Sequence, residues 1–222
     1  MVCDKNPENV RNLFNEIAQY YDKTNNFISV FSHYIIKYFA LRELNIKPRS
    51  LILDVCCGTG DFTRLIAKVS PRSRVIGVDF CENMLKIAKN KNPKGVFVLA
   101  DCLELPFKER EFNYVTAGFG LRNIKDRAKA VSEIYRVLDF DGQFLHLDFG
   151  IRNSFSKVFD RLVPVVAKCL KINLEHYKYL INSKQEFPEP DELIKEFETH
   201  GFKLVKRVDY LFGVISAQIM QK

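Results

Sequence analysis

The fold of this chain is decided by the stretch Leu51-Ile-Leu-Asp-Val-Cys-Cys-Gly-Thr-Gly-Asp-Phe-Thr63. An apolar run leads to Asp54, a tight loop with Gly58 and Gly60 follows, and Phe62 begins a segment with the pattern of a helix. Strand, glycine loop and helix in this order open a Rossmann-like unit, where glycine lets the backbone turn sharply and approach a ligand closely. We therefore expect a nucleotide-type ligand at this loop.

The acidic residues around the loop indicate which ligand it binds. A dinucleotide fingerprint needs a third glycine where Thr63 stands, and Asp54 and Asp61 would repel a pyrophosphate. The run Val75-Ile-Gly-Val-Asp79 ends in another acid, at the spacing of a carboxylate that binds ribose hydroxyls. A nucleoside with a positive sulfonium and no phosphate fits this pattern, which predicts S-adenosylmethionine. A purely structural strand turn and an unrelated nucleotide site are the alternatives.

Composition restricts the class of protein. With 222 residues, 47% hydrophobic and 27% charged, the chain can bury the core of one domain, and we expect 1–222 to form one. Its net charge of +7 is compatible with nucleic acid, an anionic membrane surface or plain solvated surface. We find no apolar run long enough to span a bilayer and no leader pattern at the start. The six cysteines form no C-x-x-C pair, which favours reduced thiols, a cytoplasmic location and no zinc.

Strand and helix patterns alternate through the middle of the chain. Such alternation predicts an α/β fold with a parallel sheet, right-handed crossovers and ligands at the carboxyl ends of the strands. The predicted strands are 51–55, 74–78, 96–99, 112–117 and 143–148, and the predicted helices between them are 61–69, 82–92 and 126–138. Residues Asp54, Asp79, Asp101, Gly118 and Asp148 stand at or directly after the strand ends and should meet at one edge of the sheet.

The rest of the chain flanks this core, which we assign to 49–150. Residues 1–48 should form a helical cover, with helices at 9–18 and 32–44 and a break at 20–26. Residues 151–200 should form substrate-side helices, and 201–222 should close the sheet as two strands with a hairpin around Asp209-Tyr210. The substrate-side helices are predicted at 154–171, 175–183 and 191–199. From the cover, Tyr21, Asp22, Asn25 and His33 could reach the ligand, or could serve only helix packing and capping.

Three segments resemble the quinone-biosynthesis C-methyltransferases, which are the demethylmenaquinone and polyprenyl-benzoquinol methyltransferases. They are Asp54-Val-Cys-Cys-Gly-Thr-Gly-Asp61, Gly118-Phe-Gly-Leu-Arg-Asn123 and Tyr21-Asp22 with Asn25. The first segment is common among class I methyltransferases, whereas the Phe-Gly-Leu-Arg-Asn string is more specific. The resemblance implies a Rossmann-like class I fold: a mostly parallel, twisted, seven-stranded sheet with helices on both faces and an antiparallel C-terminal hairpin strand.

The resemblance also implies a donor site and the acceptor chemistry. S-adenosylmethionine contacts are implied at Thr59, Asp79, Asp101, Cys102 and Gly118, although serine is frequent in the family at the last position. The donor site that we predict further includes Asp54, Gly58, Gly60, Phe80 and Tyr21. The implied reaction is methyl transfer to a ring carbon of a polyprenyl quinol in menaquinone or ubiquinone biosynthesis, with no metal.

Ring methylation needs a deprotonated hydroxyl beside the attacking carbon, so the enzyme must stabilise a phenolate. Arg122 is too basic to accept a proton but can provide this stabilisation, with Asn123 beside it; a salt bridge to a neighbouring carboxylate is its structural alternative. Candidate bases are Asp22, His33, Asp148 and a bound water. For His33 and Asp148 a structural role is an equal alternative.

Other functions compete with this one. The alternatives are another small-molecule or lipid methyltransferase on the same scaffold, an RNA-binding module that uses the +7 charge, and a protein that binds the donor without catalysis. Base methyltransferases carry an Asn/Asp-Pro-Pro-Tyr/Phe element where this chain has Ala117-Gly-Phe-Gly-Leu, which disfavours nucleic acid as a partner. We expect peripheral contact with an anionic membrane at its inner face, and leave a homodimer open. The pattern does not distinguish a naphthoquinol from a benzoquinol.

Overall fold

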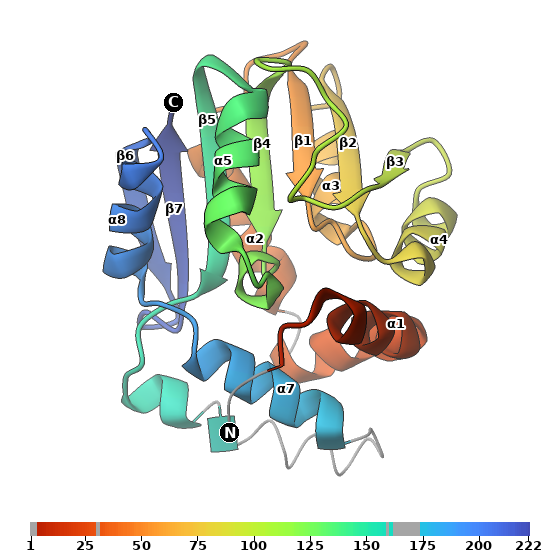
Figure 1. Cartoon of the computed structure of the whole chain (residues 1–222), viewed down its shortest axis with the longest axis vertical. Helices are drawn as coiled ribbons and strands as arrows, with labels where there is room; N and C mark the ends of the chain where they lie inside the picture. Colours follow the sequence, from red (N-terminus) through yellow and green to blue (C-terminus); the bar gives the residue numbers. More distant parts are fainter. Residues whose placement is uncertain (1–3, 30–31, 159, 162–173) are drawn as a thin grey trace.

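The computed structural model describes residues 4–29, 32–158, 160–161 and 174–222 (Figure 1). These residues form a seven-stranded sheet with the order β3-β2-β1-β4-β5-β7-β6. The strands are β1 (Leu51–Val55), β2 (Arg74–Asp79), β3 (Val96–Leu99), β4 (Phe112–Gly118), β5 (Leu138–Phe149), β6 (Lys203–Tyr210) and β7 (Ile215–Gln221). The first five strands pair in parallel, and β7 is antiparallel to both β5 and β6. The predicted fold class, including the antiparallel C-terminal hairpin, is confirmed.

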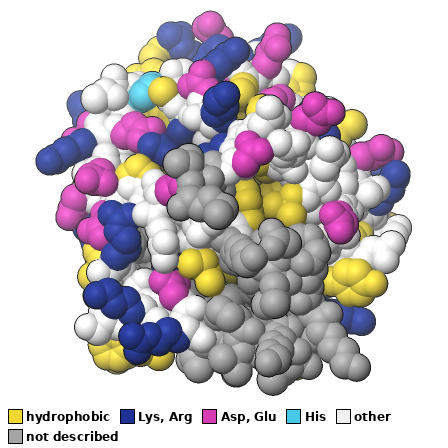
Figure 2. All heavy atoms as spheres, turned by 60° about the horizontal axis from the view of Figure 1, so that its bottom comes forward, with side chains coloured by type: hydrophobic (Ala, Val, Ile, Leu, Met, Phe, Trp, Pro, Cys, Tyr) yellow, Lys and Arg dark blue, Asp and Glu magenta, His cyan; other side chains and the backbone are white. Residues whose placement is uncertain are grey.

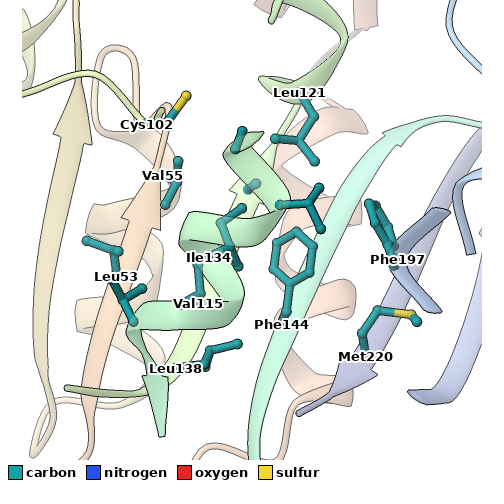
Figure 3. Packing of buried hydrophobic residues seen from close by; sticks show 14 of the residues in the cluster. Leu53, Val55, Cys102, Val115, Leu121, Ile134, Leu138, Phe144, Phe197 and Met220 are labelled. Carbon is teal, nitrogen blue, oxygen red and sulfur yellow. The ribbon is translucent and has the colours of Figure 1, made fainter. Parts of the chain in front are cut away.

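Helices cover both faces of the sheet and produce two hydrophobic cores. On one face, α5 (Arg127–Val137) and α8 (Pro190–Thr199) pack on residues that include Leu53, Val115 and Phe144 (Figure 3). On the other face, α2 (Ser32–Glu43) and α3 (Asp61–Val69) pack on Ile52, Leu145 and Leu147. Because both faces of the sheet are buried at its centre, β1 is a nearly continuous apolar run, as is usual for parallel sheets.

The order of the strands places a crevice at the carboxyl end of β1. This strand lies between β2 and β4, so the crossovers that follow β1 and β4 run to opposite sides of it. Such a switch point is where open α/β sheets bind ligands. In Figure 1, α1 (Pro7–Ser29) and α7 (Leu174–Gln185) lie beyond this end of the sheet, while α4 (Glu82–Lys91) follows β2. A short helix, η1 (Leu121–Asn123), follows β4.

The predicted break at 20–26 is wrong, because α1 is one helix from Pro7 to Ser29. Polar residues made this stretch resemble a loop. Asp22 has its partners on α4 and the glycine loop, so the polar face of α1 is satisfied by tertiary contacts that a local pattern does not reveal. Asn25 likewise lines the cavity at the sheet edge.

Two boundaries near the C-terminal half also differ from expectation. Strand β5 begins at Leu138, not at 143, because Leu138 pairs with Phe112 across an irregular register. The hairpin turn lies at 211–214 and not at Asp209-Tyr210, because the apolar residues Leu211 and Phe212 resemble a strand in sequence. Of the helix predicted at 154–171, residues 154–158 and 160–161 are helical; the remainder lies outside the described residues.

Candidate functional site

A cavity of about 310 Å³ lies at the carboxyl ends of the strands. Its walls come from the loops after β1, β2, β3 and β4 and from α1 and α2. The predicted site residues that line it are Tyr21, His33, Asp54, Gly58, Thr59, Asp79, Phe80, Asp101, Cys102, Gly118, Arg122 and Asn123. Three predicted residues are not in its wall: Asp22, Gly60 and Asp148. Viewed from this end, hydrophobic side chains line a hollow near the middle of the face (Figure 2).

The two glycines of the loop after β1 have different roles. Gly58 has φ +54°, and a Cβ atom added to it would meet nothing within 4 Å, so its backbone borders open cavity space. Gly60 has φ +76°, and its Cβ would lie 2.9 Å from the Cβ of Ala88 and 3.2 Å from the ring of Phe97. Left-handed φ favours glycine at both positions. Gly60 therefore permits close packing of the loop on α4 and β3, which explains its absence from the cavity wall.

Asp79 holds the glycine loop and the start of α4 together. Its Oδ2 accepts a hydrogen bond from the Gly58 backbone N–H at 2.8 Å, and its Oδ1 accepts one from the Cys81 N–H at 2.9 Å. Burial raises the pKa of Asp79 above its usual value, and these two N–H donors only partly offset the effect. The carboxylate also lines the cavity, where it can accept a hydrogen bond from a ligand hydroxyl.

Asp54 is the most deeply placed carboxylate of the cavity. It is 1% exposed and accepts hydrogen bonds from the hydroxyls of Thr63 at 2.6 Å and Thr116 at 2.8 Å. Burial raises the pKa of Asp54 to about 6, against the lowering effect of these hydroxyls. The sequence motif indicated the acid, but the two threonines that hold it come from α3 and β4 and were not predicted.

A second polar cluster joins the cover to the donor loop. Asp22 on α1 accepts a hydrogen bond from the Thr59 hydroxyl at 2.6 Å and one from Lys91 of α4 at 2.7 Å. Lys91 also forms an ion pair with Asp61. Burial opposes ionisation of Asp61, but Lys37 and Lys91 outweigh it and hold its pKa below the usual value. Asp22 is thus a tether for α1 in this structure.

Lys37 is a cavity residue that the sequence did not reveal. Its Nζ lies 6.0 Å from the centroid of the Phe62 ring, and the carboxylates of Asp54 and Asp61 are near enough to favour its charge. Burial nevertheless lowers the pKa of Lys37, because a desolvated ammonium is costly. The residue stands on a helix with no motif around it, so only the tertiary structure brings it to the donor loop.

Arg122 is buried beside the cavity and bound to Asp148. Its Nη1 donates to the Phe119 carbonyl at 2.5 Å and to Asp148 Oδ1 at 2.9 Å. Its guanidinium also lies 5.2 Å from the centroid of the Phe149 ring. Among the described residues, Arg122 Nε and Asp148 Oδ2 are buried without a hydrogen-bond partner. The salt bridge that the sequence left open as an alternative is therefore present.

Asn123 and His33 complete the wall near Arg122. Asn123 Oδ1 accepts a hydrogen bond from the Tyr179 hydroxyl of α7 at 3.2 Å. His33 Nδ1 lies 2.6 Å from the Ser29 hydroxyl, and its Nε2 is buried without a partner in the part of the chain that is described. Burial, aided by the charge of Lys37, lowers the pKa of His33 to about 4. The imidazole is therefore neutral at pH 7.

Four thiols border the same cavity: Cys56, Cys57, Cys81 and Cys102. A hydrogen bond with Cys102 is the main cause of the raised pKa of Cys56. Burial is the main cause of the raised pKa of Cys57 and of Cys81, and the negative charge of Asp79 raises both pKa values further. All three are thus mainly thiols, the unreactive form, at pH 7.

We predict that maleimides label Cys57, Cys81 and Cys102 slowly and that S-adenosylmethionine, or its demethylated product, slows them further. A bound donor would fill the cavity that the reagent must enter. Mass spectrometry of labelled peptides over time measures each site, and urea-unfolded protein provides the rate for fully accessible thiols. Equal labelling of the three with and without the donor would contradict the placement of the donor in this cavity.

Comparison with known proteins identifies the family. Residues 2–222 match the model of the ubiE/COQ5 methyltransferase family. The chain belongs to the ubiE/COQ5 methyltransferase family. Among relatives, it is 37% identical to the demethylmenaquinone methyltransferase of Staphylococcus carnosus, over 97% of this chain and 93% of that one. The corresponding enzyme of Geobacillus stearothermophilus is 35% identical, with 97% of each chain covered.

Solved structures agree with the fold of this ubiE/COQ5 family member. A chain of the complex between the Haloferax volcanii Trm112 methyltransferase activator and a methyltransferase has a TM-score of 0.71 at 15% identity, over 96% of both chains. A SAM-dependent methyltransferase from Aquifex aeolicus has a TM-score of 0.63 at 16% identity, over 83% of this chain and 88% of that one. Family and fold together make the protein an S-adenosylmethionine-dependent methyltransferase.

The cavity residues fit S-adenosylmethionine. The open space above Gly58 admits close approach of a ligand, and carboxylates of Asp54, Asp61 and Asp79 surround the loop. This set suits a sulfonium and ribose hydroxyls and disfavours phosphate. Within the described ranges, no group of three or more His, Cys, Asp and Glu side chains is arranged to hold a metal ion. None of the helices searched there is long and apolar enough to cross a membrane.

Proposed function

We propose that this methyltransferase transfers a methyl group to a ring carbon of a demethylmenaquinone-type polyprenyl naphthoquinol. The observation that carries the proposal is Arg122, a buried cation that borders the donor cavity and whose Nε has no hydrogen-bond partner among the described residues. The names of the curated relatives favour the naphthoquinol over the benzoquinol.

The proposed donor site extends along the ends of β1, β2 and β3. Asp79 binds the ribose hydroxyls, Asp101 and Cys102 border the base, and the Gly58 backbone lies against the nucleoside. The further donor residues that we propose are Tyr21, Asp54, Thr59, Phe80 and Gly118. Gly60 acts indirectly in this proposal: it does not contact the donor, but it lets the loop pack closely on α4 and β3. When bound, S-adenosylmethionine supplies an electrophilic methyl group.

The proposed acceptor side is organised by Arg122. Its positive charge, held in a poorly solvated place, stabilises the phenolate that develops beside the attacking ring carbon. Asn123 and the rings of Phe119 and Phe149 bound the same space. Asp148 holds the guanidinium in position and is not in the cavity wall, so we assign it positioning rather than proton transfer.

His33 is the proton acceptor that the geometry favours among the predicted bases. Asp22 has both carboxylate oxygens in hydrogen bonds and is outside the cavity wall, whereas His33 Nε2 is without a partner among the described residues. Its low pKa keeps it neutral and able to accept a proton, but weak as a base. Stabilisation of the phenolate by Arg122 therefore makes the larger contribution in this proposal.

A polyprenyl quinol resides in a bilayer, so the proposed function places the enzyme at a membrane surface, at its inner, cytoplasmic face. The positive net charge of +7 favours peripheral contact with anionic lipid. In this proposal α1, α2 and α7 form a cover that admits the quinol head and leaves the isoprenoid tail near the lipid. The homodimer stays a prediction.

The test is incubation with isotope-labelled S-adenosylmethionine and a matched panel of acceptors. The panel contains a demethylated naphthoquinol and a benzoquinol with the same short isoprenoid tail, each in reduced and oxidised form. We expect C-methylation of the reduced naphthoquinol, measured by mass spectrometry, and no product from either oxidised quinone, which cannot form a phenolate. Preference for the benzoquinol, an O-methylated product, or no product from the panel would contradict the proposal.

A further inference from the structure

A group of exposed hydrophobic side chains stands at the rim of the cavity. We call Phe155, Val158, Leu211 and Phe212 the apolar tip. Their exposed fractions are 54%, 52%, 51% and 76%. Leu211 also lines the cavity, as do Val214 of the turn and Ile215 directly after it. The apolar tip is therefore continuous with the space in which we place the acceptor.

The apolar tip is built into the fold. The rings of Phe155 and Phe212 stack with centroids 4.5 Å apart and an interplanar angle of 14°. The Asn153 side chain donates a hydrogen bond to the Phe212 carbonyl at 2.6 Å, and the Ile151 N–H donates to the Gly213 carbonyl at 2.8 Å. The hairpin turn is thus attached to the segment after β5, and Phe212 is displayed by a supported backbone.

The backbone of the turn makes these residue types unexpected. Leu211 has φ 50° and Phe212 has φ 56°, both in the left-handed region, and Gly213 follows with φ 88°. Tight hairpins with such angles normally use asparagine, aspartate or glycine, because larger side chains are strained there. Small polar residues would tolerate the left-handed backbone at positions 211 and 212 better, and they would also be better solvated there. Two large hydrophobic residues at this place point to a function outside folding.

Basic side chains accompany the apolar tip. Segment 151–161 contains Arg152, Lys157 and Arg161 and a single acid, Asp160, which forms an ion pair with the buried Lys184. All three basic residues are exposed, and Arg152 also donates to the carbonyls of Gln185 and Phe187. Apolar side chains with cations beside them match a bilayer, whose acyl region lies under anionic headgroups.

We propose that the apolar tip inserts into an anionic lipid bilayer and brings the mouth of the cavity against the membrane. Phe155, Val158 and Phe212 enter the boundary between headgroups and acyl chains, while Lys157 and Arg161 contact anionic headgroups. A lipid acceptor then passes from the bilayer along Leu211 into the cavity. This inference rests on the proposed function for the identity of the acceptor, but membrane binding is measured without donor or acceptor.

The test is flotation of the full chain with vesicles of phosphatidylcholine, with and without phosphatidylglycerol. The variant is Phe212→Ser, and the matched control is Phe140→Ser, which removes a phenylalanine of 64% exposure at the amino end of β5. We expect wild type to bind the anionic vesicles, Phe212→Ser to bind about tenfold more weakly or worse, and the control to bind like wild type. Lys157→Glu should weaken binding to anionic vesicles only, whereas Lys94→Glu, at the loop before β3, should not.

A second measurement relates binding to function. Phe212→Ser should slow methylation of a long-tailed quinol held in vesicles and leave methylation of a short-tailed, dissolved quinol unchanged, because Phe212 is not in the cavity wall. Absence of product from the short-tailed quinol in wild type would contradict the proposed function. It would not affect the test of membrane binding, because flotation is measured without donor or acceptor. Equal vesicle binding by Phe212→Ser and Phe140→Ser would overturn the apolar tip as a membrane contact. So would a wild-type dimer that Phe212→Ser dissociates without change in vesicle binding.

Discussion

Replacing Arg122 with alanine is expected to lower turnover of a reduced naphthoquinol about 10²–10³-fold, the usual effect of removing one oxyanion stabiliser. The guanidinium is nearly fully buried, so its charge is only weakly screened where the phenolate would form. Donor affinity should change little, because Arg122 is not among the donor contacts that we propose. Single-turnover kinetics and donor calorimetry measure the two effects separately.

The Arg122 variant needs a control for stability. Its partner Asp148 is 0% exposed, and a buried carboxylate that loses its cation typically costs about 3–5 kcal/mol. The double variant Arg122→Ala/Asp148→Asn removes the stranded charge and should recover much of the stability, measured by thermal unfolding, while turnover stays low. Arg122→Lys should recover little turnover, since a lysine ammonium lacks the planar, delocalised guanidinium and its further N–H groups.

Two results would contradict the phenolate role. One is turnover of Arg122→Ala within a few-fold of wild type at a temperature where the variant is folded. The other is restoration of turnover in the double variant along with stability, which would show that Arg122 acts only by neutralising Asp148.

Replacing Asp79 with alanine is expected to weaken S-adenosylmethionine binding by roughly 1.5–3 kcal/mol, or about 10- to 150-fold, the scale of a hydrogen bond to a charged group that is lost. The carboxylate also accepts the N–H groups of Gly58 and Cys81, so its removal loosens the loop that approaches the nucleoside. Calorimetry with S-adenosylmethionine and with its demethylated product measures the loss, which should be similar for both because they share the ribose.

The matched control for Asp79 is Asp139→Ala. Asp139 also accepts a hydrogen bond from a backbone N–H, that of Phe140. It stands near the amino end of β5, whereas the cavity lies at the carboxyl ends of the parallel strands. Its removal should leave donor affinity unchanged. Asp79→Asn keeps the shape and one acceptor oxygen, and should bind the donor with intermediate affinity. Unchanged affinity in Asp79→Ala would remove this residue from the ribose role.

The sequence by itself determined the sheet and the position of the donor loop. Apolar runs that end in Asp54 and Asp79, with glycines after the first, are local patterns, and the order of strands along the chain restricts how a parallel sheet can form. Parallel strands place their carboxyl ends at one edge, so even the approach of Asp101 and Cys102 to the same cavity followed from sequence order. The family motif that contains Arg122 and Asn123 suggested the acceptor side that we propose.

Only the tertiary structure decided which side chains form hydrogen bonds and ion pairs with the site residues. The cluster of Asp22, Thr59 and Lys91 joins positions far apart in sequence, and no periodicity encodes such a contact. For the same reason the polar stretch within α1 resembled a loop. The pairing of Arg122 with Asp148 depends on β5 lying beside β4 and on η1 folding back toward it, which are packing events. Local patterns report what each segment prefers, whereas partners, burial and shifted pKa values arise only when distant segments meet.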